Sequence, residues 1–121
     1  MVALDPAHIV GLGGAVGAIL RQWVSRLVDI EGYPIGTFTV NVLGTFLLGT
    51  ITFLGVDSTI SWFFGVGLSG SFTTFSSFSF ETIRLWETEE RWRAVMNAVG
   101  NLLGAGLAIG LSWLLVQALA G

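Results

Sequence analysis

The sequence predicts an all-α membrane protein with four transmembrane helices, and three observations support this fold class. Of its 121 residues, 53% are hydrophobic and only 11% are charged, and the mean hydropathy is +0.80. Ordinary soluble domains carry about 25% charged residues. Four stretches are each long enough to cross the hydrocarbon core, for which about 20 apolar residues in a helix suffice. Because the connections between them are short, we expect one membrane domain over residues 1–121.

The four spans are predicted from long runs of apolar residues. The first covers about residues 7–28 and contains Arg21, and the second covers about residues 36–56 without any charge. The third covers about residues 60–86, and the fourth, residues 94–120, is free of charge throughout. The start of the chain lacks the basic segment of a signal peptide, so the first span is expected to be retained.

Composition excludes several functional classes. The chain has no cysteine and a single histidine, His8, so a metal site built from thiolates or imidazoles is excluded. It contains five basic side chains, all arginine, against eight acidic ones, which leaves a net charge of −3. Nucleic-acid binding requires a basic surface, and this chain has none.

Arginines at the predicted span ends indicate an orientation. Arg26, Arg91 and Arg93 lie at one side of the membrane, whereas the termini and the loop around Asp57 carry no arginine. Loops rich in basic residues stay in the cytoplasm. Both termini are therefore expected outside the cell.

Polar side chains within the spans are functional candidates by default, because they are costly in lipid unless partnered. Arg21 lies either at the floor of a water-filled vestibule, where its charge concentrates anions, or at the interface by snorkelling. Thr37 and Asn41 are four residues apart and share a helix face. The Asn41 amide offers two donors without net charge, which suits a dehydrated anion, but it can equally join two helices.

The third span contains the most specific pattern, SGSFTTFSSFS from Ser69 to Ser79. The span is about 40 Å long if fully helical, which is longer than the membrane core. A break in the helix near mid-membrane explains both this excess length and the concentration of Gly, Ser and Thr. Freed carbonyls at such a break are ligands for Na⁺. Phe75 and Phe78 can present the positive edges of their rings to a small anion. The alternative is a continuous helix, bent by hydroxyl bonds to its own backbone.

A second polar stripe lies on the fourth span. Asn97 and Asn101 are one turn apart and face the same way, as pore groups or as helix-joining amides. Glu81 follows the phenylalanine segment and is either a vestibule carboxylate or a partner for Arg21 or Arg84.

These segments together resemble the Fluc (also called CrcB) family of fluoride channels. The resemblance rests on GGAVGAILR at 13–21, GTFTVN at 36–41, GSFTTFSSFSFE at 70–81 and the Asn97 and Asn101 pair. It implies an antiparallel, dual-topology dimer with two fluoride pores and a structural Na⁺ at its centre.

The resemblance also implies roles for individual residues. The backbone carbonyls of Gly70 and Thr73 would hold Na⁺, while Ser71 and Phe72 depart from a frequent Gly-Leu pair. Ser77 replaces the usual threonine of a hydroxyl track. The fluoride pore would be lined by Asn41, Phe75, Phe78, Ser76, Ser77, Thr37, Asn97 and Asn101.

The resemblance thus implies a fluoride-selective channel in the inner membrane of a prokaryote, crossing it several times, that exports fluoride. Because the residues offer no acid/base pair or nucleophile, we expect passive transport and no catalysed reaction. Its partners would be fluoride, lipid and a second, oppositely oriented subunit, identical or homologous. The alternative is a small proton-coupled multidrug exporter with four spans, which requires a carboxylate where the first span has Arg21. A membrane scaffold without transport would leave the hydroxyl-rich phenylalanine segment unexplained.

Overall fold

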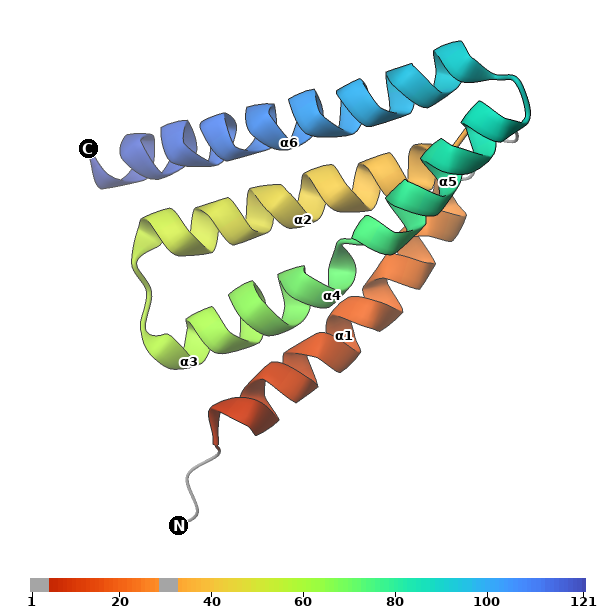
Figure 1. The fold of residues 1–121 in the computed structure, drawn as a ribbon. Helices are drawn as coiled ribbons and strands as arrows, with labels where there is room; N and C mark the ends of the chain where they lie inside the picture. The colour runs from red at the N-terminus through yellow and green to blue at the C-terminus, as the bar shows by residue number, and fades with distance from the viewer. Residues whose placement is uncertain (1–4, 29–32) are drawn as a thin grey trace.

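The computed structural model describes residues 5–28 and 33–121, and all the regular elements in these ranges are helices (Figure 1). The all-α prediction is therefore confirmed for the described part of the chain. The predictions about the N-terminal start and about most of the first connection concern residues 1–4 and 29–32, which lie outside the described residues.

The first two helices agree closely with the predicted spans. Helix α1 comprises Pro6–Leu27, and helix α2 comprises Ile35–Leu54. Pro6 occupies the first turn of α1, where its missing N–H has no helical partner to lose. α2 ends at Gly55, whose φ of 64° is the left-handed conformation that terminates many helices.

The third predicted span is a chain of short helical pieces. It consists of α3 (Ser58–Ile60), the π-helix η1 (Ser61–Ser69), α4 (Gly70–Phe72) and α5 (Phe75–Glu87). The chain leaves helical geometry between α4 and α5 and continues in a new direction (Figure 1). The predicted break is confirmed, and a continuous bent helix is wrong. The π-helical geometry of η1 was not predicted.

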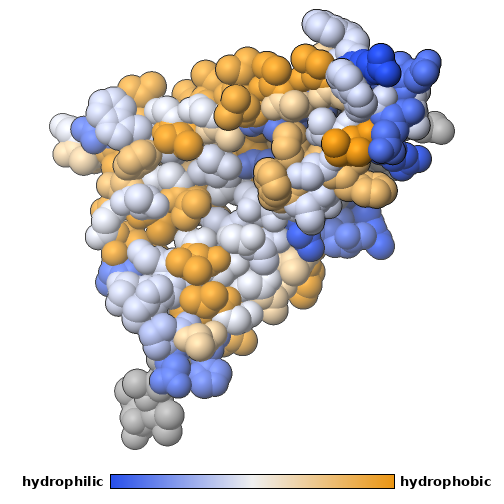
Figure 2. Space-filling model, viewed as in Figure 1, coloured by the Kyte–Doolittle hydropathy of each residue, from blue (hydrophilic) through white to orange (hydrophobic). Residues whose placement is uncertain are grey.

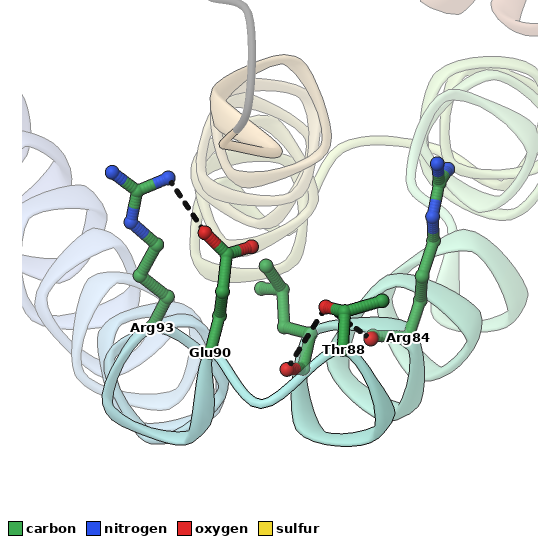
Figure 3. Close-up of polar contacts among 5 residues, drawn as sticks. Arg84, Thr88, Glu90 and Arg93 are labelled. Atoms are coloured by element: carbon green, nitrogen blue, oxygen red, sulfur yellow. Dashed lines mark hydrogen bonds and ion pairs between the residues drawn. The ribbon is translucent and has the colours of Figure 1, made fainter.

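Helix α6, Arg91–Ala120, is 30 residues long and starts three residues before the predicted span. A tight turn precedes it, in which Glu89 has a φ of 63°. Thr88 Oγ1 donates to the carbonyl oxygens of Arg84 at 2.9 Å and Leu85 at 3.3 Å, and Arg93 pairs with Glu90 at 3.5 Å (Figure 3). These local bonds reverse the chain so that α6 returns beside α2 and α5.

The helices form two packed groups that share α2. α2 lies along α6, whereas α1 packs against η1 and α4 (Figure 1). The buried core is small and is centred on Val40, Leu68 and Phe72. Phe72 therefore anchors the segment just before the break.

The contact between α1 and η1 depends on glycines. A Cβ at Gly13 would collide with the carbonyl oxygen of Phe63, and one at Gly67 would lie 2.6 Å from the carbonyl oxygen of Val10. Gly17, on the same helix as Gly13, is equally restricted, since a Cβ there would collide with Leu68 and Ser71. By contrast, a Cβ at Gly106 or Gly110 would meet nothing within 4 Å in the described chain.

The outer surface is apolar. Within the described ranges, α2 and α6 are the helices long and apolar enough to cross a membrane. Large side chains such as Ile19, Leu102 and Leu119 are at least 70% exposed. Hydrophilic residues gather near the turn between α5 and α6, while hydrophobic residues cover much of the visible length of α6 (Figure 2). A surface of this kind suits lipid rather than water.

Candidate functional site

The centre of the site is the two-residue gap between α4 and α5. Thr73 and Thr74 have extended backbones, with ψ of 161° at Thr73 and φ of −146° at Thr74. Thr74 is the N-cap of α5, and its Oγ1 accepts a hydrogen bond from the Ser77 amide at 3.1 Å. A threonine hydroxyl in this position satisfies a first-turn amide that has no helical partner. The segment around Thr74 therefore ends one helix and starts the next.

Asn41 on α2 holds the backbone of this gap with both ends of its side chain. Its Oδ1 accepts from the Thr74 amide at 2.7 Å, and its Nδ2 donates to the Thr74 carbonyl at 3.1 Å. Since these two bonds replace partners that a continuous helix would provide, they stabilise the break. The sequence allowed Asn41 either to bind an anion or to join two helices. In the described chain its two bonds to Thr74 join α2 to the segment between α4 and α5.

Carbonyl groups before and within the gap lose their helical donors, and those of Gly70 and Thr73 are among them. In a continuous helix the Thr74 amide would donate to Gly70, and the Ser77 amide would donate to Thr73. Here the Thr74 amide donates to Asn41 and the Ser77 amide donates to the Thr74 hydroxyl. The carbonyl oxygens of Gly70 and Thr73 are thus released from the helix, and oxygen is the ligand type that a hard cation prefers.

A cavity of about 370 Å³ opens beside the gap and is lined by both predicted phenylalanines. The Phe75 and Phe78 rings lie 5.9 Å apart between centroids and are tilted by 46°. Phe75 is 79% exposed, which is unusual for a ring at a functional site unless another surface covers it. Asn41, Asn101, Gly70 and Thr73 also line this cavity, which we call the phenylalanine cavity.

A second cavity of about 410 Å³ also borders the gap and is polar. Thr74 lines both cavities. Sequence reasoning missed Gln22 and Ser25, which lie one and four residues beyond Arg21 and so extend the same polar wall. The predicted site residues around this second cavity, which we call the vestibule, are Arg21, Thr37, Ser76, Ser77 and Glu81.

Glu81 and Thr37 face each other in the vestibule. Thr37 Oγ1 donates to Glu81 Oε1 at 2.9 Å, and Glu81 Oε2 is buried without a hydrogen-bond partner among the described residues. Within residues 5–28 and 33–121, no ion pair joins Glu81 to Arg21 or Arg84. Of the two roles considered for Glu81, the contacts favour the vestibule carboxylate.

Asn97 and Asn101 on α6 are buried, with exposures of 1% and 7%. Asn101 lines the phenylalanine cavity, whereas Asn97 lines neither cavity and donates to Thr82 Oγ1 at 2.8 Å. Thr82 was missed by sequence reasoning, although it lies four residues after Phe78 and therefore on the same helix face.

Ser71 was expected only as a departure from the family pattern, and the structure gives it a contact. Its Oγ donates to the carbonyl oxygen of Gly14 on α1 at 2.6 Å. Together with the buried ring of Phe72, this bond ties α4 to the rest of the chain immediately before the break. Ser71 and Phe72, the two residues that depart from the family pattern, therefore fix the position of the segment that contains Gly70 and Thr73.

The apolar helices, the break and the two cavities at Thr74 define a small helical membrane protein with polar groups collected inside it. Such a collection is typical of a protein that moves a polar solute or ion. The chain belongs to the CrcB family, because the family model described as "CrcB-like protein, Camphor Resistance (CrcB)" matches residues 8–113.

Similar proteins carry names of one kind. A protein of Haloarcula marismortui named fluoride-specific ion channel FluC 2 is 52% identical over 117 residues, which are 97% of this chain and 98% of that protein. Fluoride-specific ion channel FluC 1 of Halobacterium salinarum is 47% identical, covering 92% of this chain and 93% of that protein. A FluC of Helicobacter pylori strain Shi470 is 39% identical over 91% of this chain and 92% of its own length. These similarities do not support the multidrug-exporter alternative.

Proposed function

We propose that this protein is a fluoride-selective channel that exports fluoride by passive electrodiffusion and so confers fluoride resistance on a prokaryotic cell. The observation that carries the proposal is the break at Thr73 and Thr74, which brings Asn41, Phe75 and Phe78 to one cavity. The names of the similar proteins support the same ion.

The path is built from neutral groups. Fluoride enters from the vestibule, where Arg21 concentrates anions, and passes the hydroxyls of Ser76 and Ser77 before reaching the phenylalanine rings. Hydroxyls, amides and ring edges replace water one contact at a time, and none forms the deep well that a buried cation would create. Conduction requires binding that is favourable enough for entry and weak enough for exit. No bond is formed or broken, so the protein is a channel and not an enzyme.

The whole chain forms one membrane domain that crosses the cell membrane four times. α1, α2 and α6 each form a span, and the segment from α3 to α5 forms the third, interrupted near the middle of the membrane. The break is compatible with lipid only where protein or a water-filled cavity surrounds it. The two cavities beside Thr74 provide these surroundings.

The carbonyl oxygens of Gly70 and Thr73 bind a structural Na⁺. Both have lost their helical donors, and both residues line the phenylalanine cavity, so the donor set fits a hard monovalent cation. The ion would supply positive charge that holds the break in place. Two carbonyls do not complete a coordination shell, and further oxygens would come from an equivalent pair in a second subunit.

The second subunit lies antiparallel to the first. Phe75 is 79% exposed next to the cavity that it lines, so one chain leaves the proposed pore wall open. The partner is either a second copy or an oppositely oriented homologue. The described arginines near the turn between α5 and α6 favour one orientation of this chain, which supports a homologous partner.

Efflux of ions from liposomes tests the proposed function. Purified protein is reconstituted into vesicles loaded with potassium fluoride or potassium chloride and a low concentration of Na⁺, and external anion is followed with ion-selective electrodes after a K⁺ ionophore lets K⁺ leave as the counter-ion. Fast fluoride efflux with chloride retained is the expected result. Equal loss of both anions, or loss only with a proton gradient, would refute a passive fluoride-selective channel.

The same measurement separates the two assemblies. Strong flux from the single purified chain indicates a homodimer. If flux appears only after co-expression with a homologous partner, the working channel is a heterodimer.

A further inference from the structure

All three asparagines of the chain belong to one hydrogen-bond network. Asn41 Nδ2 donates to Asn101 Oδ1 at 3.2 Å. Asn101 Nδ2 donates in turn to the backbone carbonyl of Asn97 at 2.8 Å and to Asn97 Oδ1 at 3.1 Å. Asn97 Nδ2 donates to Thr82 Oγ1 at 2.8 Å. The network therefore connects the break on the third segment to α6 and back to α5.

The direction of every bond in this network follows from one backbone amide. The Thr74 N–H can only donate, so the atom of Asn41 that faces it at 2.7 Å is the oxygen. The Asn41 nitrogen must then face Asn101, which accepts through Oδ1. The Asn101 nitrogen consequently faces two acceptors on Asn97. Turning the Asn101 amide over would place its oxygen against those acceptors, so Asn101 presents an oxygen to Asn41.

This arrangement occupies both N–H groups of Asn41. One donates to the Thr74 carbonyl, within the break, and the other donates to Asn101 Oδ1. Asn41 and Asn101 both line the phenylalanine cavity. An anion in that cavity can gain a donor from Asn41 only by displacing the oxygen of Asn101, because the bond to Thr74 also maintains the break.

We propose that Asn101 is an affinity-setting residue, whose side-chain oxygen competes with fluoride for the second N–H group of Asn41, the one not bound to Thr74. Asn97 is the positioning residue that holds this oxygen in place by accepting both Asn101 N–H groups. The inference rests on the proposed function and specifies how that site keeps its anion weakly bound. A neutral hydrogen bond is displaced at modest cost, and rapid exit from a pore requires such weak binding.

Concentration-dependent currents in planar bilayers test the competition. Asn101→Leu removes the competing oxygen with little change in volume, so the half-saturating fluoride concentration should fall about two- to tenfold, the range expected for one neutral hydrogen bond. The limiting current should fall as well, because exit becomes slower. Asn97→Leu should shift both quantities in the same direction by a smaller amount. An unchanged or increased half-saturating concentration in Asn101→Leu would overturn the proposal.

Two further variants separate competition from a general loss of structure. Ser112→Ala changes another buried polar residue of α6, outside the phenylalanine cavity, and should leave the half-saturating concentration unchanged. Asn101→Asp keeps an acceptor in place and adds negative charge, so fluoride should bind more weakly than in the unmodified protein. If Asn101→Leu does not fold, an unchanged or tighter fluoride response in Asn101→Asp contradicts the proposal.

Nuclear magnetic resonance of the full-length protein in micelles gives a readout that does not depend on conduction. Because the chain has three asparagines, ¹⁵N-asparagine labelling yields three side-chain amide signals. Sodium fluoride, titrated against sodium chloride as control, should move the Asn41 signal at lower concentration in Asn101→Leu than in the unmodified protein. An identical response in both proteins would refute competition even where liposome flux supports the channel. Absence of fluoride flux in liposomes, alone or with a homologous partner, would instead refute the proposed function.

Discussion

Two regions of this small protein are built on opposite principles. Where α1 meets η1, glycines bring backbones so close that an added methyl at Gly13 collides with the Phe63 carbonyl. Where α4 meets α5, the backbone leaves the helix, and the Phe75 ring beyond it is 79% exposed. The first region is complete within one chain. The second leaves carbonyls without helical donors, and two phenylalanine rings, on residues that line a cavity.

The difference shows how a chain of 121 residues can be both rigid and open. Lipid offers no hydrophobic driving force between helices, so close backbone contact at small residues supplies the packing energy. The tight contact of α1 and η1, with the Ser71 bond to Gly14, supports a break that would be unstable alone in lipid. Changes in the packed region should therefore affect folding, and changes at the break should affect ion passage.

The largest effect is expected at the packed region. Gly13→Ala places a methyl group against a backbone carbonyl that cannot rotate away, and overpacking of this kind costs about 1–3 kcal/mol or more. The variant should give little monodisperse protein in size-exclusion chromatography and a lower thermal midpoint. Gly106→Ala is the matched control, because its methyl meets nothing within 4 Å. Equal yield and thermal midpoint in the two variants would contradict the proposal that the contact between α1 and η1 determines folding.

A large effect on transport alone is expected at the phenylalanine cavity. Phe75→Ile or Phe78→Ile removes a ring whose edge is proposed to contact fluoride, so fluoride flux should fall about tenfold, equivalent to about 1.4 kcal/mol, while the protein stays folded. Phe80→Ile is the control on the same helix, since Phe80 is 67% exposed and lines neither cavity. Normal flux in both cavity variants would argue against ring-edge contacts with the ion.

Removal of Na⁺ should have an intermediate effect. Replacing Na⁺ by K⁺ at equal ionic strength removes the ion proposed at the Gly70 and Thr73 carbonyls, which should lower the thermal midpoint by several degrees and weaken dimer assembly. The midpoint should rise with the logarithm of Na⁺ concentration. Differential scanning fluorimetry and size-exclusion chromatography measure both quantities. If the thermal midpoint and the dimer fraction are the same in Na⁺ and K⁺, the Na⁺ site proposed at the Gly70 and Thr73 carbonyls is contradicted.

The smallest effect is expected at the vestibule. Arg21→Gln removes a charge that concentrates anions, so flux should fall a few-fold at low ionic strength, and the deficit should disappear near 1 M salt, where the screening length is about 3 Å. Arg26→Gln is the control, because Arg26 is exposed and lies outside the vestibule lining. A salt-independent deficit in Arg21→Gln would indicate a structural role instead.

Sequence reasoning found the helices and the break because both depend on local composition. Long apolar runs predict helices in lipid, and the concentration of Ser, Thr and Gly before Phe75 predicted where one of them is interrupted. It missed the bond from Ser71 to Gly14 and the role of Thr82, since their partners lie 57 and 15 residues away in the sequence. Spacing along one helix carries no information about such partners.

The sequence by itself determined the apolar surface, the bounds of α1 and α2 to within two residues and the set of neutral polar groups within the spans, because these follow from residue type and short-range spacing. Only the tertiary structure decided how those groups are paired. The sequence left Asn41 open between anion binding and helix joining, and in the structure its donors meet Thr74 and Asn101. Glu81 accepts from Thr37 and forms no ion pair with an arginine of the described chain. Hydrogen bonds are directional and short in range, so their pattern is set when α2, α5 and α6 come together.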